Sequence, residues 1–260
     1  MYENITAVKE NSVLWLTLNR PDKLNALVGR AREEIFSALE QADQDQSVKA
    51  ICITGAGKGF CAGGDINYMA SLQKDNNLAA FQSLLESGRQ VVTKIRAIEK
   101  PVIAMINGVA AGAGLNLALA SDIRIASASA RFSQAFIKIG LHPDWGGTFF
   151  LPRLIGTARA CEMIFTGDVI DAQTAYQIGL VNQVVADNEL LAKTQELLAK
   201  LVSRPRQALA LAKKAIYKGV ESSLAEALDY ETLAQTECFQ SEDAKEGIEA
   251  FLARRDPKFR

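Results

Sequence analysis

The sequence predicts an α/β protein, in which short buried strands alternate with helices, followed by a helical C-terminal region. Residues 102–106 form an apolar run typical of a buried strand, and the small residues 109–114 lead from it into an apolar helix pattern at 115–120. A second apolar run, at residues 50–54, is likewise followed by a glycine-rich segment. From residue 188 onward, apolar residues recur only at helical spacing. We therefore expect one large α/β core with a helical appendage.

The first hundred residues begin with a predicted hairpin. Residues 5–9 and 13–18 alternate apolar and polar side chains, and Glu10-Asn11-Ser12 between them is typical of a turn. In the helices that follow, apolar residues stand three and four positions apart, as Ala31, Ile35 and Ala38 do. The elements expected in this part are a loop at 19–27, a helix at 30–45, a buried strand at 48–54, two helices over 66–90 separated by the polar residues 74–77, and a helix at 91–98.

The second part of the chain contains the remaining strands and four long helices. After the strand at 102–106 we expect strands at 123–126 and 131–133, helices at 159–166 and 171–178, a strand at 183–186, and helices at 190–201, 205–219, 224–239 and 242–254. The last four helices carry more apolar surface than a small bundle can bury, as Leu224, Leu228 and Phe239 illustrate. Such an excess is typical of a surface where subunits meet.

Composition is ordinary for a soluble globular protein and argues against several classes of function. The 260 residues are 48% hydrophobic and 23% charged, which suits a single large core. A formal net charge of −1 gives no reason to expect binding to nucleic acid or to an anionic membrane. Cys52, Cys61, Cys161 and Cys238 are scattered without a CxxC pair, so we expect reduced thiols and neither a disulfide framework nor a metal site.

The first residues, MYENITAVKENS, show neither a secretory signal pattern nor an Arg/Ser-rich transit pattern. No apolar run approaches the roughly 18 residues of a membrane span. We therefore expect a cytoplasmic protein that has no membrane partner.

Two glycine-rich segments follow predicted strands, and each could present a backbone N–H group to a ligand. They span residues 55–65 and 109–114. A backbone without side chains can approach a ligand closely, and a helix that begins there points unpaired N–H groups at it. Two such donors fixed on one oxygen form an oxyanion hole. The alternative is that both segments are ordinary tight turns. Neither has the spacing of a P-loop or a dinucleotide fingerprint.

Four motifs, in this order and at these intervals, resemble the crotonase superfamily of enoyl-CoA hydratases and isomerases. They are NRPDKLNAL at residues 19–27, GFCAGGDI at 59–66, NGVAAGAGLNLALASD at 107–122 and LPRLIG at 151–156. The resemblance covers nearly the whole chain. It implies an acyl-CoA-binding spiral of strand–strand–helix turns over residues 1–187. It also implies that the helical region 188–260 joins subunits into homotrimers or homohexamers.

The resemblance also implies which residues form the site. The amides of Gly64 and Ala113 would hold the oxygen of a thioester enolate. The loop with Lys23, Leu24 and Ala26 would cup the adenine end of coenzyme A, or else it is only a polar surface connection. The other residues expected at the substrate are Ala62, Asp65, Ile66, Met69, Asn116, Phe136, His142 and Trp145, with Phe259 near a neighbouring subunit's coenzyme A. No metal and no cofactor beyond the substrate's coenzyme A is expected.

The sequence departs from this family at its acids and bases. Hydratases of the family carry two glutamates, and Asn116 and Phe136 occupy the matching positions. Because hydration needs one group to activate water and another to protonate carbon, the usual hydratase route is disfavoured. One carboxylate remains, Asp144 in the segment PDWGGT, which looks most similar to the ring-oxepin isomerases of phenylacetate degradation. Apolar neighbours would raise its pKa. Alternatively, Asp144 only caps backbone groups in a turn.

A single base at Asp144 predicts a double-bond shift from a 3-enoyl-CoA to a 2-enoyl-CoA. Several alternatives stay open: Asp144 as a nucleophile toward an aryl-CoA, thioester hydrolysis, a residual enoyl-CoA hydratase, or a non-catalytic relative that binds acyl-CoA or RNA. His142, the only histidine, is either structural or tunes Asp144. Phe136 and Trp145 are interpreted as pocket walls.

Overall fold

The computed structural model describes residues 2–259, and its strands form two sheets. The strands of the large sheet are, in spatial order, β1 (Ile5–Glu10), β2 (Val13–Leu18), β3 (Ala50–Gly55), β5 (Val102–Ile106), β7 (Ile123–Ser127) and β10 (Gln183–Val185). Those of the small sheet are β4 (Gly59–Cys61), β6 (Val109–Ala111), β8 (Arg131–Ser133) and β9 (Ile170–Asp171). The chain is thus the α/β protein that the sequence predicts.

Successive strands alternate between the two sheets. β3, β5 and β7 run parallel in the large sheet, and β4, β6 and β8, each following one of them in the chain, run parallel in the small sheet. Each turn of the chain therefore adds one strand to each sheet before a helix or connection returns it. This is the expected strand–strand–helix spiral.

The strands β4 and β6 were not predicted, because both lie in the glycine-rich segments. Each has only three residues, too few to show the alternation that marks a strand. They form because the backbones meet directly: a Cβ on Gly108, just before β6, would stand 2.0 Å from the carbonyl oxygen of Lys58. Close backbone approach at Gly108 therefore accompanies the burial of Phe60 in β4 and Ala110 in β6.

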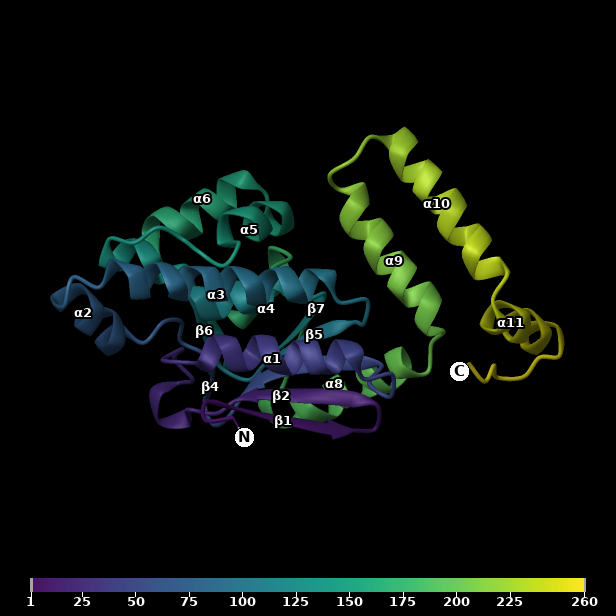
Figure 1. Cartoon of the computed structure of the whole chain (residues 1–260), viewed down its shortest axis with the longest axis horizontal. Coiled ribbons are helices and arrows are strands. Elements are labelled where there is room, and N and C mark those ends of the chain that lie inside the picture. The colour runs from purple at the N-terminus through teal and green to yellow at the C-terminus, as the bar shows by residue number, and fades with distance from the viewer. Residues whose placement is uncertain (1, 260) are drawn as a thin grey trace.

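The helices surround the sheets and continue beyond them (Figure 1). They are α1 (Ala31–Gln44), α2 (Ile66–Lys74), α3 (Leu78–Ala97), α4 (Ala113–Ala120), α5 (Gly147–Ile155), α6 (Thr157–Thr166), α7 (Ala172–Gln177), α8 (Leu190–Val202), α9 (Arg206–Gly219), α10 (Leu224–Phe239) and α11 (Glu242–Leu252). Short 3-10 turns occur at η1 (Pro21–Lys23), η2 (Ala135–Ile139) and η3 (Asp187–Glu189).

Two helices differ from the sequence prediction. α3 is a single helix, although residues 91–98 were expected as a separate one. α5 was not predicted, because Gly146-Gly147 and Pro152 are residues that ordinarily interrupt helices. It forms because Phe150, Leu151 and Ile155 share a buried face.

Both faces of the large sheet are covered at β3, which explains why β3 is buried throughout. Ile51 and Ile53 point into the core cluster that includes α1 and α4. Ala50 and Cys52 point the other way, into a second cluster with Leu190 and Leu198 of α8. Residues of opposite parity along one strand therefore serve two separate cores.

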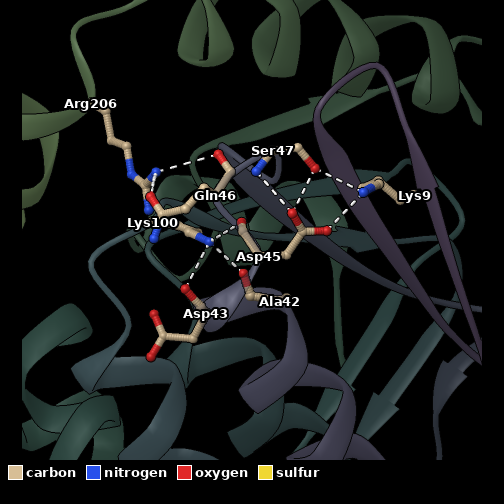
Figure 2. Close-up of polar contacts among 8 residues, drawn as sticks. All are labelled: Lys9, Ala42, Asp43, Asp45, Gln46, Ser47, Lys100 and Arg206. Carbon is tan, nitrogen blue, oxygen red and sulfur yellow. Dashed lines mark hydrogen bonds and ion pairs between the residues drawn. The ribbon is translucent and has the colours of Figure 1, made fainter. Parts of the chain in front are cut away.

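The end of α1 is tied to neighbouring segments by a buried lysine (Figure 2). The ammonium of Lys100, 2% exposed, donates to the main-chain oxygens of Ala42, Asp43 and Asp45. These contacts satisfy carbonyls that the end of a helix leaves unpaired. Lys9 binds the Asp45 side chain at 2.8 Å, and Arg206 at the start of α9 binds Gln46.

The helices α9 to α11 stand apart from the sheets (Figure 1), and α9 docks through another lysine. Lys213 forms an ion pair with Asp122 at 2.9 Å and donates to the main-chain oxygen of Lys100 at 3.0 Å.

The predicted domain boundary between residues 187 and 188 stays a prediction. The helix just beyond it, α8, packs on the large sheet. Within residues 2–259 no helix combines the length and apolar character needed to cross a membrane.

Candidate functional site

A cavity of about 530 Å³ opens between the start of α1, the glycine-rich segments, the α2–α3 pair and the segment 135–145. Its wall brings together many of the residues singled out from the sequence: Ala62, Gly64, Ile66, Met69, Ala113, Phe136, His142, Asp144 and Trp145. The wall is predominantly apolar. Its charged side chains, within the described residues, are Arg32, Lys138 and Asp144, so Asp144 is the single carboxylate there.

The N–H group of Gly64 is left free by the way its neighbours bond. Leu27 donates from its N–H to the Gly63 oxygen at 2.7 Å and accepts from the Asp65 N–H at 3.0 Å. In an extended segment, alternate residues point their polar groups to opposite sides. The Gly64 amide therefore points away from Leu27, and it donates no hydrogen bond within residues 2–259.

The second free amide belongs to Ala113, the first residue of α4. Gly112 before it has φ +51°, a conformation that favours glycine and turns the next peptide into the site. Like that of Gly64, the Ala113 N–H donates no hydrogen bond within the described chain. A Cβ placed on Gly63 would lie 3.6 Å from the Ala113 nitrogen, so the two glycine-rich segments meet at this point. Two unpaired amides on one cavity wall are the arrangement of an oxyanion hole.

Asp144 is held by a tight turn and by a buried amide. Trp145 and Gly146 have φ values of +49° and +77°, and the Gly147 N–H donates to the Asp144 main-chain oxygen at 3.0 Å. This is the pattern of a type I′ turn. The same oxygen accepts from Nδ2 of Asn116 at 2.8 Å. The turn and the Asn116 amide together fix the main chain of Asp144, whose side chain forms part of the cavity wall.

The carboxyl group of Asp144 has the properties of a proton acceptor. Its Oδ1 atom is buried and has no hydrogen-bond partner within residues 2–259. Burial raises the pKa of Asp144 to about 6, while the positive charge of Arg32 opposes that rise. A base with a pKa near neutrality can both take up and return a proton at physiological pH.

Comparisons with known proteins identify the family of the chain. Residues 8–260 match the model of the family described as enoyl-CoA hydratase/isomerase. The chain belongs to the enoyl-CoA hydratase/isomerase family. It is 40% identical to the 1,2-epoxyphenylacetyl-CoA isomerase of Escherichia coli K12, over 100% of this chain and 99% of that protein. It is also 40% identical to a crotonyl-CoA hydratase of Syntrophomonas wolfei, over 99% and 98% of the two chains.

Solved structures of the family share the fold over the full length. A crystal structure titled enoyl-CoA hydratase/isomerase from Mycobacterium abscessus superposes with a TM-score of 0.95 at 35% identity, covering 98% of this chain and 99% of the other. The relatives thus include proteins named as isomerases and as hydratases. The chain is an acyl-CoA enzyme of this family, and its particular reaction has to be argued from its own residues.

Asn116 and Phe136, which the sequence predicts to occupy the family's glutamate positions, have different surroundings. Phe136 lines the cavity. Asn116 is fully buried behind it, where its Nδ2 donates to Asp144 and its Oδ1 accepts from Nε2 of Gln134 at 2.7 Å. Asn116 is therefore positioned to support Asp144, and its predicted role as a substrate-binding residue stays a prediction.

The predicted coenzyme A loop adjoins the cavity. The main-chain oxygen of Leu24 accepts from the Ala62 N–H at 2.9 Å, which joins this loop to the segment that carries Gly64. Lys23 is exposed, and the main-chain oxygen of Ala26 accepts from Arg20 at 2.6 Å. Arg20 also pairs with Asp65 at 3.1 Å, and Asp65 caps α2 by accepting from the N–H groups of Asn67 and Tyr68.

Phe259 lies away from the cavity, in a hollow formed by α9, α10 and α11. The expectation that it approaches a neighbour's coenzyme A concerns a second subunit and stays a prediction. Within residues 2–259, no three or more His, Cys, Asp or Glu side chains gather in a way that could hold a metal ion.

Sequence reasoning missed Arg32, which is 5% exposed and lines the cavity. A signal was present, because Arg32, Ile35 and Leu39 are spaced three and four residues apart along α1. That spacing places an arginine on the buried face of the helix. Its guanidinium carries a charge that acts directly on Asp144.

Proposed function

We propose that this enzyme moves a double bond, converting a 3-enoyl-CoA into a 2-enoyl-CoA. The observation that carries the proposal is Asp144, the single carboxylate on the cavity wall within the described residues. One proton carrier suffices for an isomerisation, whereas hydration requires one group for water and another for carbon.

In the proposed reaction, the Asp144 carboxylate removes a proton from C2 of the substrate. The electrons of the broken C–H bond move into the thioester, which becomes a conjugated enolate. The amides of Gly64 and Ala113 donate hydrogen bonds to the enolate oxygen and stabilise it more than the neutral carbonyl. The Asp144 carboxylic acid then returns the proton to C4, the carbonyl re-forms, and the double bond lies between C2 and C3. The cycle balances without a cofactor beyond the substrate's coenzyme A.

The test is the fate of the double bond in wild type and in Asp144→Asn, followed by NMR with 3-hexenoyl-CoA as substrate. We expect the wild type to form 2-hexenoyl-CoA and the variant to lose activity by at least about 100-fold, since the amide cannot accept the proton. Binding of saturated hexanoyl-CoA serves as the control for an intact site. Wild-type rates in Asp144→Asn, or no double-bond shift in wild type, would contradict the proposal.

An enoyl-CoA hydratase is the second candidate, because several relatives carry that name. With Asn116 and Phe136 at the predicted glutamate positions, Asp144 and His142 are the carboxylate and the imidazole on the cavity wall that could serve such a reaction. Assaying crotonyl-CoA separates the two reactions by product, since hydration adds water and forms 3-hydroxybutyryl-CoA, whereas isomerisation forms no hydroxylated product. Hydration faster than isomerisation of the 3-enoyl substrate would favour the hydratase.

We further propose that the chain assembles as a homotrimer or homohexamer in the cytoplasm. Exposed apolar side chains support the assembly: Leu224, Leu233, Phe239, Phe251 and Leu252 on α10 and α11 are each at least 70% exposed in the single chain. Four free cysteines are compatible with a reducing compartment. Light scattering at micromolar concentration measures the assembly, and a monomer would contradict it.

A further inference from the structure

Gly88 stands in the middle of α3, where a glycine is unfavourable compared with alanine. The backbone does not call for glycine at this position, because the φ angle of Gly88 is not in the left-handed region. The space does. A Cβ on Gly88 would stand 2.1 Å from Nε1 of Trp145, and 2.6 and 2.8 Å from Cε2 and Cδ1 of the same ring. The missing side chain therefore lets the indole lie directly on the helix.

Trp145 extends from a main chain that is already fixed. It is the second residue of the turn that begins at Asp144, it has a φ angle of +49°, and it is 5% exposed. A methyl group at position 88 would have to displace the indole, and a buried ring on a fixed turn can yield only by leaving its favoured side-chain conformation. The observed place of the ring thus depends on glycine at position 88.

The indole of Trp145 separates two hollows of the molecule. One is the cavity of about 530 Å³ that carries Asp144, and the other is a groove of about 790 Å³ between α3, α5 and α9. Among the described residues, Leu85 and Trp145 line both hollows. Because Leu85 is exposed and Trp145 is buried, the indole is the inner part of this partition.

We propose that Trp145, positioned by Gly88, is the wall that limits the size of the acyl group. The groove beyond the ring is lined by apolar side chains, including Val92, Phe149 and Phe150, so a hydrocarbon chain that reached it would gain from burial. With the ring in place, a chain in the cavity stops at the partition. This inference rests on the proposed function only in taking the cavity as the acyl site.

The test compares butyryl-CoA with decanoyl-CoA, which are saturated and bind without reacting. Calorimetry on the full-length protein gives both dissociation constants, and the ratio of the butyryl to the decanoyl value reports how well a long chain is received. Trp145→Ala should raise this ratio about tenfold over wild type, as expected for about two further methylene groups buried in the groove. Trp145→Leu should raise it less, and keeps the test informative if the alanine variant folds poorly.

Phe149→Ala is the matched control for loss of an aromatic ring. Phe149 lines the groove but not the cavity, so this variant widens the groove without opening the partition and should keep the wild-type ratio. A chain could instead run between α2 and α3, where a hollow of about 350 Å³ adjoins the cavity at Met69 and Phe81. Such a chain would not meet Trp145, and an unchanged ratio in Trp145→Ala would overturn the inference.

Gly88→Ala tests the positioning role of the glycine. We expect the ratio to rise at least about threefold, because the methyl group pushes the indole off the helix and opens the partition, and we expect the midpoint of urea unfolding to fall. In the Trp145→Ala background the same substitution should leave the ratio unchanged and raise the midpoint, since no ring opposes the methyl group and alanine is the better helix former.

Gly219→Ala is the control for the effect of alanine on a helix, because a Cβ on Gly219 in α9 would meet no atom within 4 Å. This variant should keep the wild-type ratio. An unchanged or lower ratio in Gly88→Ala, or equal effects of Gly88→Ala with and without the indole, would show that Gly88 does not position Trp145.

Failure of this inference is distinguishable from failure of the proposed function. If both thioesters bind and their ratio does not respond to Trp145→Ala, only the wall falls. If the ratio responds as expected but 3-hexenoyl-CoA is not isomerised by the wild type, the wall stands and the reaction falls. If neither thioester binds, both fall together.

Discussion

Nδ2 of Asn116 donates a hydrogen bond of 2.8 Å to the main-chain oxygen of Asp144, from a fully buried position behind the cavity. The same side chain accepts from Gln134, so its orientation is fixed at both ends. Asn116, which the family resemblance places at a predicted glutamate position, thus holds the main chain of Asp144. The loss of one carboxylate and the placement of the other are linked through a single amide.

This link predicts that Asn116→Asp harms the enzyme although the two side chains have the same shape. The acceptor for Gln134 remains, but the donor becomes a carboxylate oxygen that faces the Asp144 carbonyl. We expect kcat to fall by at least about tenfold and the free energy of unfolding by about 2–4 kcal/mol. Steady-state kinetics and urea unfolding measure the two effects.

Asn182→Asp is the control for the same substitution elsewhere. Its Oδ1 accepts from the Arg124 N–H at 2.9 Å, and Asp keeps that acceptor at an exposed site. We expect a change in stability within about 0.5 kcal/mol. An Asn116→Asp variant as active and as stable as this control would show that the amide does not hold Asp144.

The pKa of Asp144 predicts the pH dependence of catalysis. Since burial raises this pKa to about 6 and the reaction begins with the ionised carboxylate, kcat/KM should rise with pH through about 6 and level off above it. Arg32 lowers the same pKa, so Arg32→Met should move the midpoint to higher pH. Rates from pH 4.5 to 8.5 measure both, with Arg30→Met, at the exposed start of α1, as the control. A midpoint that stays in place would refute the coupling.

The same raised pKa predicts that ionisation of Asp144 lowers the stability of the fold, although it raises the catalytic rate. The folded-state pKa of Asp144 is raised, so the unfolded chain releases its proton more readily, and stability is lost as pH rises from about 4 to 6. Asp144→Asn has no such charge to bury. Relative to wild type, its free energy of unfolding should therefore gain up to about 3 kcal/mol between pH 4 and pH 8. Urea titrations at the two pH values measure it, and a constant difference would speak against a raised pKa.

The buried ammonium of Lys100 predicts a large stability difference between two lysines. Lys100→Met leaves three carbonyls at the end of α1 without their donor and should lower the free energy of unfolding by about 2–4 kcal/mol. Lys9→Met removes a lysine whose side chain is 50% exposed and should cost at most about 1 kcal/mol. Parallel urea unfolding compares them. Equal effects would mean that Lys100 does not close the helix.

Much of the fold could be predicted from local patterns, and the misses have physical causes. Apolar runs and helical spacing located β1, β2, β3, β5 and the long helices, because each element buries a face of its own. β4 and β6 were missed because each has only three residues, too few to show an alternating pattern. α5 was hidden by glycines and a proline that tertiary burial overrides. The strand–strand–helix spiral was predicted from the family resemblance alone, and the division of its strands between two sheets was not predicted.

The site could be predicted only where it is made of motifs. Gly64 and Ala113 lie in segments that are recognisable in the sequence by their glycine content, and Asp144 lies in a recognisable turn. Arg32 lies in an ordinary helix, and only its place on the apolar face distinguishes it. The support that Asn116 gives to Asp144 joins residues 28 positions apart, a relation that becomes visible only once α4 and the Asp144 turn are in place.

The enolate-stabilising groups proposed here are main-chain amides, whose positions follow from the path of the backbone. Among the natural amino acids only proline would remove such a donor, so the ability to stabilise a thioester anion depends mainly on the path of the backbone. What evolution, or a protein engineer, can exchange freely is the set of side chains facing that anion. Introducing a carboxylate at Phe136 or removing the guanidinium of Arg32 would then change how the thioester enolate reacts, while the enolate itself would stay the intermediate.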